Sequence, residues 1–272
     1  MPVKPKLGQN FLRDPSAVAR IVAAPGDLAG RTVVEIGPGA GAITAALASR
    51  AEKLIAVELD RELAARLRER FANHPVTIIE GDILEFDFAR AAEEAGQQLI
   101  VAGNLPYGIT SPILLKLAAC HASLDRAVLM VQREVADRIT AEPGSRDYGL
   151  LSVTMQVRGP VERLFTLPPS AFVPPPDVYS SVFLWTFEPR FAQLGVEPDA
   201  FLRFVRIAFA QKRKTLVNNM RAAAVPAEKV AAALSEFGLP LQARAESLSL
   251  ERFATLFHRL ADHFSARTPD PE

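Results

Sequence analysis

Cysteine is almost missing from this sequence, and long apolar runs are missing altogether. Cys120 is the one cysteine among 272 residues, so no internal disulfide can form, and a reducing compartment suits this composition. No apolar run approaches the roughly 20 residues that span a bilayer, and residues 1–10 lack the apolar core of a secretory signal. We therefore expect a cytoplasmic protein that has no membrane partner.

Net charge is absent as well. The chain has 31 basic and 31 acidic side chains, a balance that argues mildly against a nucleic-acid-binding protein, since such domains are often basic overall. The charge is nevertheless segregated, since residues 200–227 contain no acid but carry Arg203, Arg206, Lys212, Arg213, Lys214 and Arg221. This run is compatible with a solvated helix face and also with a surface that attracts an anionic partner.

The first two thirds of the chain alternate between two kinds of pattern. Short apolar runs indicate strands of a parallel sheet that is covered on both faces, at residues 32–36, 54–57, 76–79, 99–101 and 127–131. Helical patterns lie between or after them, at residues 42–50, 61–72, 110–119 and 133–140. These repeated strand and helix units predict a doubly wound α/β fold.

The last third has a different character. A β-rich segment at residues 178–187 follows a proline-rich loop, and beyond it only helical patterns occur, at residues 199–210, 215–224, 227–237 and 250–264. We therefore predict an α/β domain at residues 1–190 and a small all-helical domain at residues 191–272, with a disordered tail after about residue 265. Residues 150–157 are apolar nearly throughout and fit either a helix or a strand.

A glycine-rich loop follows the first predicted strand. Gly37, Gly39 and Gly41 stand where a helix begins, and glycine there lets the chain turn tightly and lets a ligand approach the backbone. Glu58 ends the second strand about 20 residues later, where a carboxylate can bind two ribose hydroxyls. These features suit S-adenosylmethionine and a dinucleotide about equally, and a tight turn without any ligand is a third explanation.

Two further strand ends carry polar side chains. Asp82 follows the third strand, on the ligand edge of such a sheet, where it can accept a hydrogen bond from an adenine amino group. The tetrapeptide Asn104-Leu105-Pro106-Tyr107 follows the fourth strand, and Asn104 offers a side-chain carbonyl oxygen as an acceptor. Pro106 forces Leu105 into an extended conformation that can turn its carbonyl outward, and Tyr107 offers a flat face on which a base can stack.

This tetrapeptide indicates chemistry on an exocyclic amine. The amino group of adenine is a poor nucleophile because its lone pair is delocalised into the ring. Two acceptors that hold its N–H hydrogens can turn the lone pair toward an electrophilic methyl group, which combines preorganisation with proximity. No strong general base is needed, because the methylated amine loses its proton readily. None of the four histidines lies in a motif, so all are interpreted as structural or surface residues.

The order of these motifs resembles the small-subunit rRNA adenine N6,N6-dimethyltransferase family over nearly the whole chain. The segments that carry the resemblance are residues 6–14, 35–41, 57–60, 81–82, 104–107, 132–136, 148–153 and 172–180. The resemblance implies a Rossmann-like class I methyltransferase sheet of seven strands with the last one antiparallel, and a helix at residues 150–157. The sequence departs from the family's usual residues at Asp177, where lysine is common, and at Tyr179, where aspartate is common.

The resemblance also implies roles for individual residues. The cofactor would be S-adenosylmethionine, in contact with Asn10, Leu12, Gly37, Glu58, Asp82 and Asn104. The target adenine would be held by Asn104, Leu105, Pro106 and Tyr107, with Phe172 stacked on its other face. Phosphates of the RNA would be contacted, without any reading of bases, by Arg203, Arg206, Lys212, Arg213 and Lys214.

The reaction implied by the resemblance is the dimethylation of two adjacent adenosines in the 3′-terminal hairpin loop of 16S rRNA. It would take place within a pre-30S particle, late in ribosome assembly, and we expect a monomeric enzyme that uses no metal. Three alternatives stay open: a large-subunit rRNA adenine methyltransferase of the macrolide-resistance type, a non-enzymatic RNA-binding assembly factor, and a dinucleotide-dependent oxidoreductase.

Overall fold

The computed structural model describes residues 10–264, which pack into two units. The first unit contains the residues up to 136 together with 160–188, and the second contains residues 137–159 together with those from 189 onward. Each unit has a hydrophobic core of its own. The tail after about residue 265, which the sequence predicts to be disordered, lies outside the described residues, as do residues 6–9 of the N-terminal motif.

The first unit is built on a sheet of seven strands. They are β2 (Thr32–Ile36), β3 (Lys53–Glu58), β4 (Val76–Glu80), β5 (Leu99–Asn104), β6 (Leu124–Gln132), β7 (Val161–Leu167) and β9 (Ser180–Thr186). Their order across the sheet is β4-β3-β2-β5-β6-β9-β7. The first five of these are parallel, whereas β9 runs antiparallel to both β6 and β7. The predicted seven-stranded sheet with an antiparallel last strand is confirmed.

Burial explains which of these strands the sequence reveals. All five residues of β2 are buried, and β5 is buried except at its last residue, because both strands have neighbours on two sides. β7 lies at the edge of the sheet, and its exposed residues include Glu162 and Arg163. An edge strand of this kind has no continuous apolar run, which is why β7 is missing from the predicted strands.

A second sheet of two strands joins the start of the described chain to the proline-rich loop. β1 (Phe11–Leu12) pairs antiparallel with β8 (Phe172–Val173), so that Leu12 lies opposite Phe172. Both of these side chains are buried in the hydrophobic core of the first unit. The pairing therefore holds Phe11 and Leu12 against this unit, although neither strand is long enough to be predicted from its sequence.

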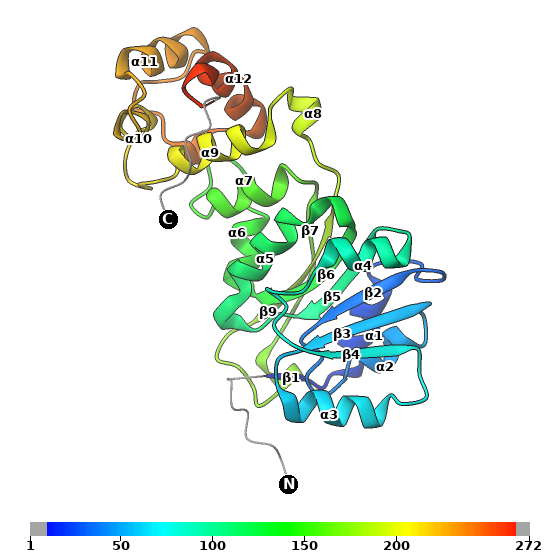
Figure 1. Cartoon of the computed structure of the whole chain (residues 1–272). Helices are drawn as coiled ribbons and strands as arrows, with labels where there is room; N and C mark the ends of the chain where they lie inside the picture. The colour runs from blue at the N-terminus through cyan, green and yellow to red at the C-terminus, as the bar shows by residue number, and fades with distance from the viewer. Residues whose placement is uncertain (1–9, 265–272) are drawn as a thin grey trace. The chain divides into compact units, whose positions relative to one another are not determined.

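Helices cover both faces of the large sheet. Those of the first unit are α1 (Pro15–Ala23), α2 (Thr44–Ala48), α3 (Arg61–Arg70), α4 (Phe88–Ala95) and α5 (Thr110–Ala119), while α6 (Arg133–Ile139) crosses into the second unit. In Figure 1, α4 and α5 lie in front of the sheet, and α1 and α2 lie behind it. Three of these helices begin at an aspartate whose carboxylate accepts backbone N–H groups of the first turn: Asp14, Asp60 and Asp87.

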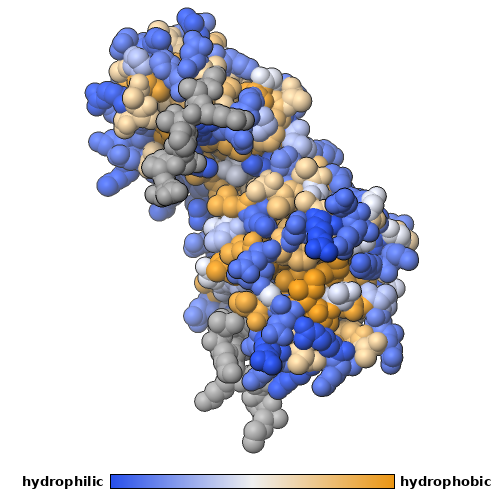
Figure 2. Space-filling model, in the orientation of Figure 1, coloured by the Kyte–Doolittle hydropathy of each residue, from blue (hydrophilic) through white to orange (hydrophobic). Residues whose placement is uncertain are grey.

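The core between the sheet and the two helices behind it is aliphatic. Ile21 of α1 and Leu47 of α2 pack in one cluster with Val33, Ile100 and Val128 of the central strands. Side chains of a strand alternate between the two faces, so every second residue of each strand contributes to this layer. On the outside of the unit, Figure 2 shows hydrophobic residues gathered in a patch with hydrophilic residues around them.

The second unit is helical, as the sequence predicts. Its helices are α7 (Leu150–Gln156), α8 (Phe191–Leu194), α9 (Pro198–Ala208), α10 (Leu216–Ala222), α11 (Ala227–Glu236) and α12 (Leu250–Leu260). Short 3₁₀ turns occur in the two units at Tyr107–Ile109, His121–Ser123, Pro169–Ala171, Ala245–Ser247 and Ala261–His263. The core of the second unit is aromatic: the ring centroid of Phe204 lies 5.2 Å from that of Phe264 and 5.8 Å from that of Phe257.

The division into units differs from the predicted domains at one segment. The sequence places the boundary at residue 190, whereas residues 137–159 pack with the helical unit. The reason is α7, because Val153 and the following Val157 are fully buried in the same core as Phe204. The apolar segment that fits a helix or a strand is therefore a helix, as the family resemblance implies. Every helix among residues 10–264 is too short or too polar to cross a bilayer.

Candidate active site

A cavity of about 510 Å³ opens at the carboxyl ends of the parallel strands. The strand order explains its position: β3 and β4 lie on one side of β2, whereas β5 and β6 lie on the other. Ligands of open α/β sheets bind at such a switch point. The cavity is lined by residues 10–12, 35–40, 42–43, 57–59, 81–83 and 104–109, so it collects the segments that follow β2, β3, β4 and β5.

The glycine loop after β2 forms one wall of this cavity. Gly37 and Gly39 have φ angles of 62° and 59°, a left-handed conformation that strains residues with a Cβ atom. The Gly37 N–H donates to the Val57 carbonyl at 3.0 Å, which ties the loop to β3. On β5, a Cβ atom at Gly103 would lie 2.6 Å from the Ile36 carbonyl oxygen. Glycine at these positions therefore serves the tight turn and the close approach of β2 and β5.

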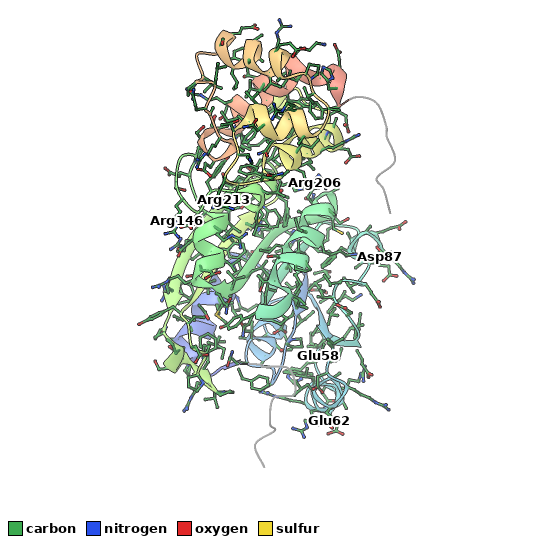
Figure 3. All side chains as sticks on the ribbon, turned by 90° about the vertical axis from the view of Figure 1, so that its left-hand side faces the viewer. Glu58, Glu62, Asp87, Arg146, Arg206 and Arg213 are labelled. Atoms are coloured by element: carbon green, nitrogen blue, oxygen red, sulfur yellow. The ribbon has the colours of Figure 1, made fainter. Side chains whose placement is uncertain are left out.

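Glu58, labelled in Figure 3, is buried at the end of β3, and its carboxylate is tied to the backbone. Its Oε2 atom accepts a hydrogen bond from the Gly39 N–H at 2.9 Å, and its Oε1 atom accepts one from the Asp60 N–H at 2.9 Å. These two bonds fix the carboxylate beside the glycine loop. Each carboxylate oxygen has a second lone pair, so the group can still accept hydrogen bonds from a ligand in the cavity.

Asp82 lies at the same edge of the sheet, after β4. Its Oδ1 atom accepts a hydrogen bond from the Leu84 N–H at 2.9 Å, a turn that holds the side chain in place. Asp82 is partly exposed and lines the cavity next to the buried Ile83. The structure thus brings Asp82, Glu58 and the glycine loop into one cavity, and their contacts with a cofactor stay a prediction.

Asn104, the last residue of β5, has one half of its amide in use and the other half free. Its Nδ2 group donates to the Asn10 carbonyl at 3.1 Å. A carbonyl oxygen can only accept, so this bond fixes which end of the amide is the NH₂ group. The Oδ1 atom is buried and has no hydrogen-bond partner within residues 10–264. The side chain therefore presents a preoriented, unpaired acceptor at the cavity, the feature that amine chemistry requires.

The rest of the tetrapeptide is held by contacts on both sides. The Leu105 N–H donates to the Met130 carbonyl at 2.9 Å, which continues the pairing of β5 with β6. The Tyr107 hydroxyl lies 2.9 Å from the Oγ atom of Ser180, the first residue of β9. Burial raises the pKa of Tyr107, and the bond to Ser180 opposes this rise. The ring of Tyr107 is therefore anchored at its far end while it lines the cavity.

One acid of the cavity, Glu35 of β2, is missing from the predicted site residues. It is 1% exposed, and its Oε2 atom has no hydrogen-bond partner among the described residues. Burial raises the pKa of Glu35 from 4.5 to about 8; the Thr44 hydroxyl opposes this rise, and the Glu58 carboxylate adds to it. An acid inside the otherwise apolar run at residues 32–36 is a signal in the sequence that identifies it.

Phe11 is a second cavity residue that the sequence does not predict. A Cβ atom at Gly39 would lie 3.0 Å from the Cδ1 and Cε1 atoms of the Phe11 ring, so the ring rests against the glycine loop. Asn10 and Leu12, which are predicted cofactor contacts, line the cavity on either side of Phe11 in the chain. This arrangement depends on the pairing of β1 with β8, and that long-range contact leaves no local pattern in the sequence.

Phe172 is buried in the core of the first unit, whereas a residue that stacks on a base in the cavity has to line it. It is 2% exposed and belongs to the core of the first unit, and the cavity lining within residues 10–264 does not include it. Its backbone pairs with Leu12, whose neighbours line the cavity. In this structure Phe172 therefore supports the cavity wall through β1, and its stacking on a base stays a prediction.

The comparison with known families identifies the chemistry of this chain. Residues 2–262 match the profile of a family described as ribosomal RNA adenine dimethylase. The chain belongs to this family. It is thus a methyltransferase that acts on adenine in rRNA, as the resemblance of its motifs implies, and the dinucleotide-dependent oxidoreductase is excluded.

Individual relatives agree with this assignment. A protein from Acidobacterium capsulatum, named ribosomal RNA small subunit methyltransferase A, is 58% identical over 95% of this chain and 92% of its own length. A dimethyladenosine transferase from Plasmodium falciparum superposes with a TM-score of 0.79 at 23% identity, covering 93% of this chain and 98% of its own. The 23S rRNA methyltransferase ErmE superposes with a TM-score of 0.71 at 27% identity, covering 93% of this chain and 100% of its own. The predicted methyltransferase fold is confirmed.

The basic side chains predicted to contact RNA all belong to the helical unit. Arg206, Lys212, Arg213 and Lys214 are exposed, and Arg203 is partly buried. The ammonium group of Lys212 donates to the Arg146 carbonyl at 2.8 Å, which brings a further exposed arginine to this group. Figure 3 shows Arg146, Arg206 and Arg213 on this unit. Arg146 is missing from the predicted set because it lies outside the basic run of the sequence.

Histidine and cysteine have structural surroundings in this protein. Ring nitrogens of His121 and His258 lie 3.0 Å from the carbonyl oxygens of Ala118 and Leu194. Burial raises the pKa of the Cys120 thiol, which disfavours the reactive thiolate. Among the residues that the structure describes, no group of three or more His, Cys, Asp or Glu side chains is arranged to hold a metal ion.

Proposed function

We propose that this protein dimethylates the N6 amino groups of two adjacent adenosines in the 3′-terminal hairpin loop of 16S rRNA, with S-adenosylmethionine as methyl donor. It would act in the cytoplasm, as a monomer, on a pre-30S particle. The observation that carries the proposal is the buried Oδ1 atom of Asn104, which has no partner among residues 10–264. A buried acceptor without a donor costs about 1–3 kcal/mol, so its presence in a cavity supports a ligand that donates to it.

The cavity suits S-adenosylmethionine. Gly37 and Gly39 leave the wall without side chains, so a ligand can approach the backbone there. The Glu58 carboxylate can accept hydrogen bonds from ribose hydroxyls, and Asp82 can accept one from an adenine amino group. When bound, this cofactor supplies an electrophilic methyl group on a sulfonium. The residues that would hold it are Asn10, Leu12, Gly37, Glu58, Asp82 and Asn104.

The target base would be held by the segment that follows β5. The Oδ1 atom of Asn104 accepts one N–H hydrogen of the adenine amine, and the Leu105 carbonyl accepts the other, which turns the nitrogen lone pair out of the ring plane. Pro106 keeps this segment extended. Tyr107 supplies the stacking face. Stacking of Phe172 on the opposite face would require its side chain to leave the core in which it is buried.

No side chain of the cavity has to remove the amine proton before transfer. The two carbonyl oxygens orient the amine, and the nitrogen becomes acidic once it has gained the methyl group, so its proton passes to water. Glu35 is protonated at neutral pH because burial raises its pKa to about 8. Its buried position thus gives the cavity a neutral wall rather than a base.

The helical unit would bind the RNA backbone. Its exposed basic groups can neutralise phosphates and position the particle without reading sequence. The residues proposed for this role are Arg203, Arg206, Lys212, Arg213 and Lys214. Extrusion of the target base costs a few kcal/mol, and it costs least in a loop that is already single-stranded.

A large-subunit substrate is the second candidate, because 93% of the chain matches the whole of the 23S rRNA methyltransferase ErmE at 27% identity. The 58% identity to a relative named for the small subunit favours 16S rRNA. The test incubates the protein and cofactor with under-methylated 30S particles and, separately, with 50S particles, and maps modified adenosines by primer extension. We expect two adjacent modified adenosines in the 30S sample. Modification found only in large-subunit RNA would overturn the proposal.

A further inference from the structure

An exposed aromatic ring lies one residue away from the anchor of the target-base platform. Tyr179 directly precedes β9 and is 46% exposed. Tyrosine is an amphipathic side chain with a large flat surface, which suits it to contact another flat group. The ring belongs to the same unit as the cavity.

Two contacts hold Tyr179 in place. The guanidinium carbon of Arg133 lies over the ring, 5.2 Å from its centroid, which is within the range of a cation–π interaction. The backbone N–H of Arg133 also donates to the backbone carbonyl of Tyr179 at 2.9 Å. One face of the ring is thus covered by a guanidinium, and the exposed remainder can receive a second flat group.

Ser180 connects this pair to Tyr107. The hydroxyl groups of Ser180 and Tyr107 are 2.9 Å apart, and Ser180 is the residue that follows Tyr179. Consecutive Cα atoms are about 3.8 Å apart, so the backbone of Tyr179 lies directly beside the residue that anchors Tyr107. Tyr107 and Tyr179 are therefore connected through one short segment of backbone.

We propose that Tyr179, backed by Arg133, is a second stacking platform that holds the nucleobase adjacent to the target adenine. The inference rests on the proposed function, because it requires a single-stranded RNA loop at the cavity. Aromatic stacking tolerates any base, so the platform holds a neighbour without selecting it. While one of two adjacent adenosines occupies the cavity, the other rests on Tyr179, ready to replace it.

The local charges make stacking the larger part of this contact. Arg133 is exposed and attracts a phosphate, but Glu134 and Asp177 are exposed acids on either side of the pair. Their repulsion opposes the attraction of Arg133 for the RNA backbone. The ring of Tyr179, and not a basic surface, is thus the main element of the platform.

The experiment measures steady-state methylation of under-methylated 30S particles by the full-length protein. We expect Tyr179→Ala to raise the KM for the particle about fivefold or more, as the loss of one base stack predicts, with cofactor affinity by calorimetry unchanged. Tyr179→Trp retains a flat ring and should keep the parental KM. We also expect Tyr179→Ala to accumulate particles in which only one of the two adenosines is dimethylated.

Val178→Ala is the matched control, because Val178 is the preceding residue, is 42% exposed and has no flat face. Its KM should stay within twofold of the parent. The inference is overturned if Tyr179→Ala keeps the parental KM and product ratio, or if Val178→Ala raises the KM equally. Both results require a parent that methylates the particle. A parent that transfers no methyl group to it overturns the proposed function itself.

Discussion

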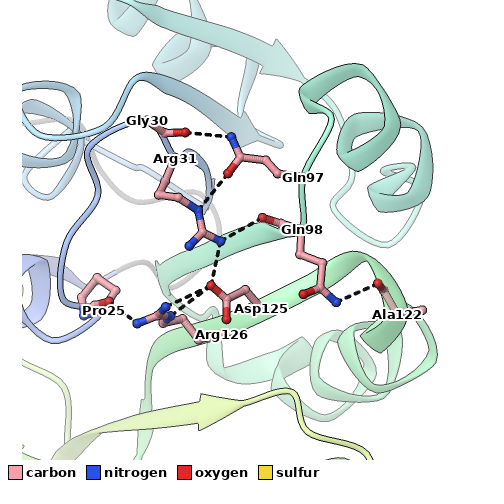
Figure 4. Close-up of polar contacts among 8 residues, drawn as sticks. All are labelled: Pro25, Gly30, Arg31, Gln97, Gln98, Ala122, Asp125 and Arg126. Carbon is pink, nitrogen blue, oxygen red and sulfur yellow. Dashed lines mark hydrogen bonds and ion pairs between the residues drawn. The ribbon is translucent and has the colours of Figure 1, made fainter.

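The two ends of the large sheet use polar side chains in opposite ways. At the amino ends of β2, β5 and β6, the side chains of Arg31, Gln97, Asp125 and Arg126 and the Gln98 carbonyl form one hydrogen-bond network (Figure 4). At the carboxyl ends, the Oδ1 atom of Asn104 and the Oε2 atom of Glu35 are buried without a partner among residues 10–264. Because one sheet carries both ends, the difference separates a structural cluster from a binding site.

The network at the amino ends is centred on one carboxylate. Arg31 donates to the Oδ2 atom of Asp125 at 2.7 Å, and Arg126 donates to the same atom at 3.0 Å. Arg31 also donates to Gln97 at 2.8 Å. Burial alone would raise the pKa of Asp125, but the hydrogen bonds from Arg126 and Arg31 outweigh it and hold the pKa below its usual value. The network thus joins the starts of three strands.

The polar groups at the carboxyl ends lower the stability of the folded chain instead. A buried acceptor without a donor destabilises the folded chain by about 1–3 kcal/mol, and a buried acid destabilises it further once it is ionised. A protein that keeps two such groups in one cavity loses stability there, and a ligand that donates to them recovers it. The comparison predicts that changes at the carboxyl ends affect transfer, whereas changes at the amino ends affect folding.

Asn104→Ala tests the ligand end of this comparison and should have the largest effect. The variant loses the acceptor for the target amine, so we expect methyl transfer to fall about 10²–10³-fold or below detection, as when one preorganised polar group is removed. Single-turnover transfer to 30S particles measures the rate, and filter binding should show RNA affinity nearly intact. Transfer within a few-fold of the parent would refute the acceptor role.

Asn219→Ala is the control for a buried asparagine. The Nδ2 group of Asn219 in the helical unit donates to the Ala208 carbonyl at 2.7 Å and to the Gln211 carbonyl at 3.2 Å. Its loss should lower the free energy of unfolding by about 1–3 kcal/mol while the transfer rate stays near that of the parent. Equal losses of transfer in both variants would mean that Asn104 acts only through folding.

The sequence reveals the polar residues at the strand ends because strand position is a local pattern. Glu58, Asp82 and Asn104 each stand at the end of an apolar run or just after it, and parallel strands bring their carboxyl ends to one edge. The sequence does not predict Phe11 as a cavity residue, because its position depends on a pairing between β1 and β8. The burial of Phe172 is not predicted for the same reason, because the sequence of a proline-rich loop does not indicate which aromatic side chain is buried.

The fold is predictable to the extent that its elements are periodic. α5 is predicted at its observed bounds, and β2 is as well, because both have a clear apolar pattern. α4 is missing from the predicted helices, although Asp87 caps its start and Gly96 ends it in a left-handed conformation. Residues 150–157 are predictable as a helix only through the family, because an apolar run does not tell which unit will bury it.

Glu35→Gln tests the second unpaired acceptor through its pH dependence. The native pKa of about 8 lies above the usual 4.5, so Glu35 stays protonated to a higher pH in the folded chain than in the unfolded chain. The stability contributed by this group is therefore fully present below pH 4.5 and is lost as the pH rises through about 8. Glutamine removes that loss, so the stability of the variant relative to the parent should rise by about 3 kcal/mol between pH 5 and 8.

Denaturant unfolding at several pH values measures this difference. Glu52→Gln is the matched control, because Glu52 is an exposed acid that precedes β3. Its stability relative to the parent should not change over the same pH range. A relative stability of Glu35→Gln that does not depend on pH would show that Glu35 is ionised and solvated in the native protein.

Tyr107→Ala removes the proposed base platform and should have an intermediate effect. We expect the affinity for a base analogue to fall by about 1–3 kcal/mol, the value of one stacked base. Tyr107→Phe keeps the ring and loses only the hydroxyl bond to Ser180, so it should retain most of the affinity. Competition binding measures both variants, and unchanged affinity in Tyr107→Ala would show that the base stacks elsewhere.

Asp125→Asn tests the opposite end of the sheet. The pKa of Asp125 is held below its usual 3.8. The stability that Asp125 contributes to the folded chain is therefore present above that pH and is lost as the pH falls through the native pKa. The asparagine variant should lose about 1 kcal/mol of unfolding free energy at neutral pH, since the pair is partly exposed. Transfer at a temperature where both proteins are folded should be unchanged. A loss of transfer without a loss of stability would contradict the structural role.

Ser180→Ala should have the smallest effect. The variant removes the anchor of the Tyr107 ring, so we expect a two- to threefold rise in the KM for RNA, equivalent to about 0.5 kcal/mol. Ser181→Ala is the matched control: both serines are fully buried on β9, but the Ser181 hydroxyl lies 2.9 Å from that of Thr166 on β7. Side chains of neighbouring strand residues point to opposite faces, so Ser181→Ala should reduce stability and leave the KM unchanged.

The pair of serines also tests coupling at the cavity. If Ser180 acts through Tyr107, the double variant Ser180→Ala, Tyr107→Phe should raise the KM no more than either single variant, because both remove the same hydrogen bond. Additive effects would mean that the two hydroxyls act independently. Equal KM values in the Ser180→Ala and Ser181→Ala proteins would show that Ser180 does not anchor the Tyr107 ring. The position of that ring would then depend on the backbone after β5 alone.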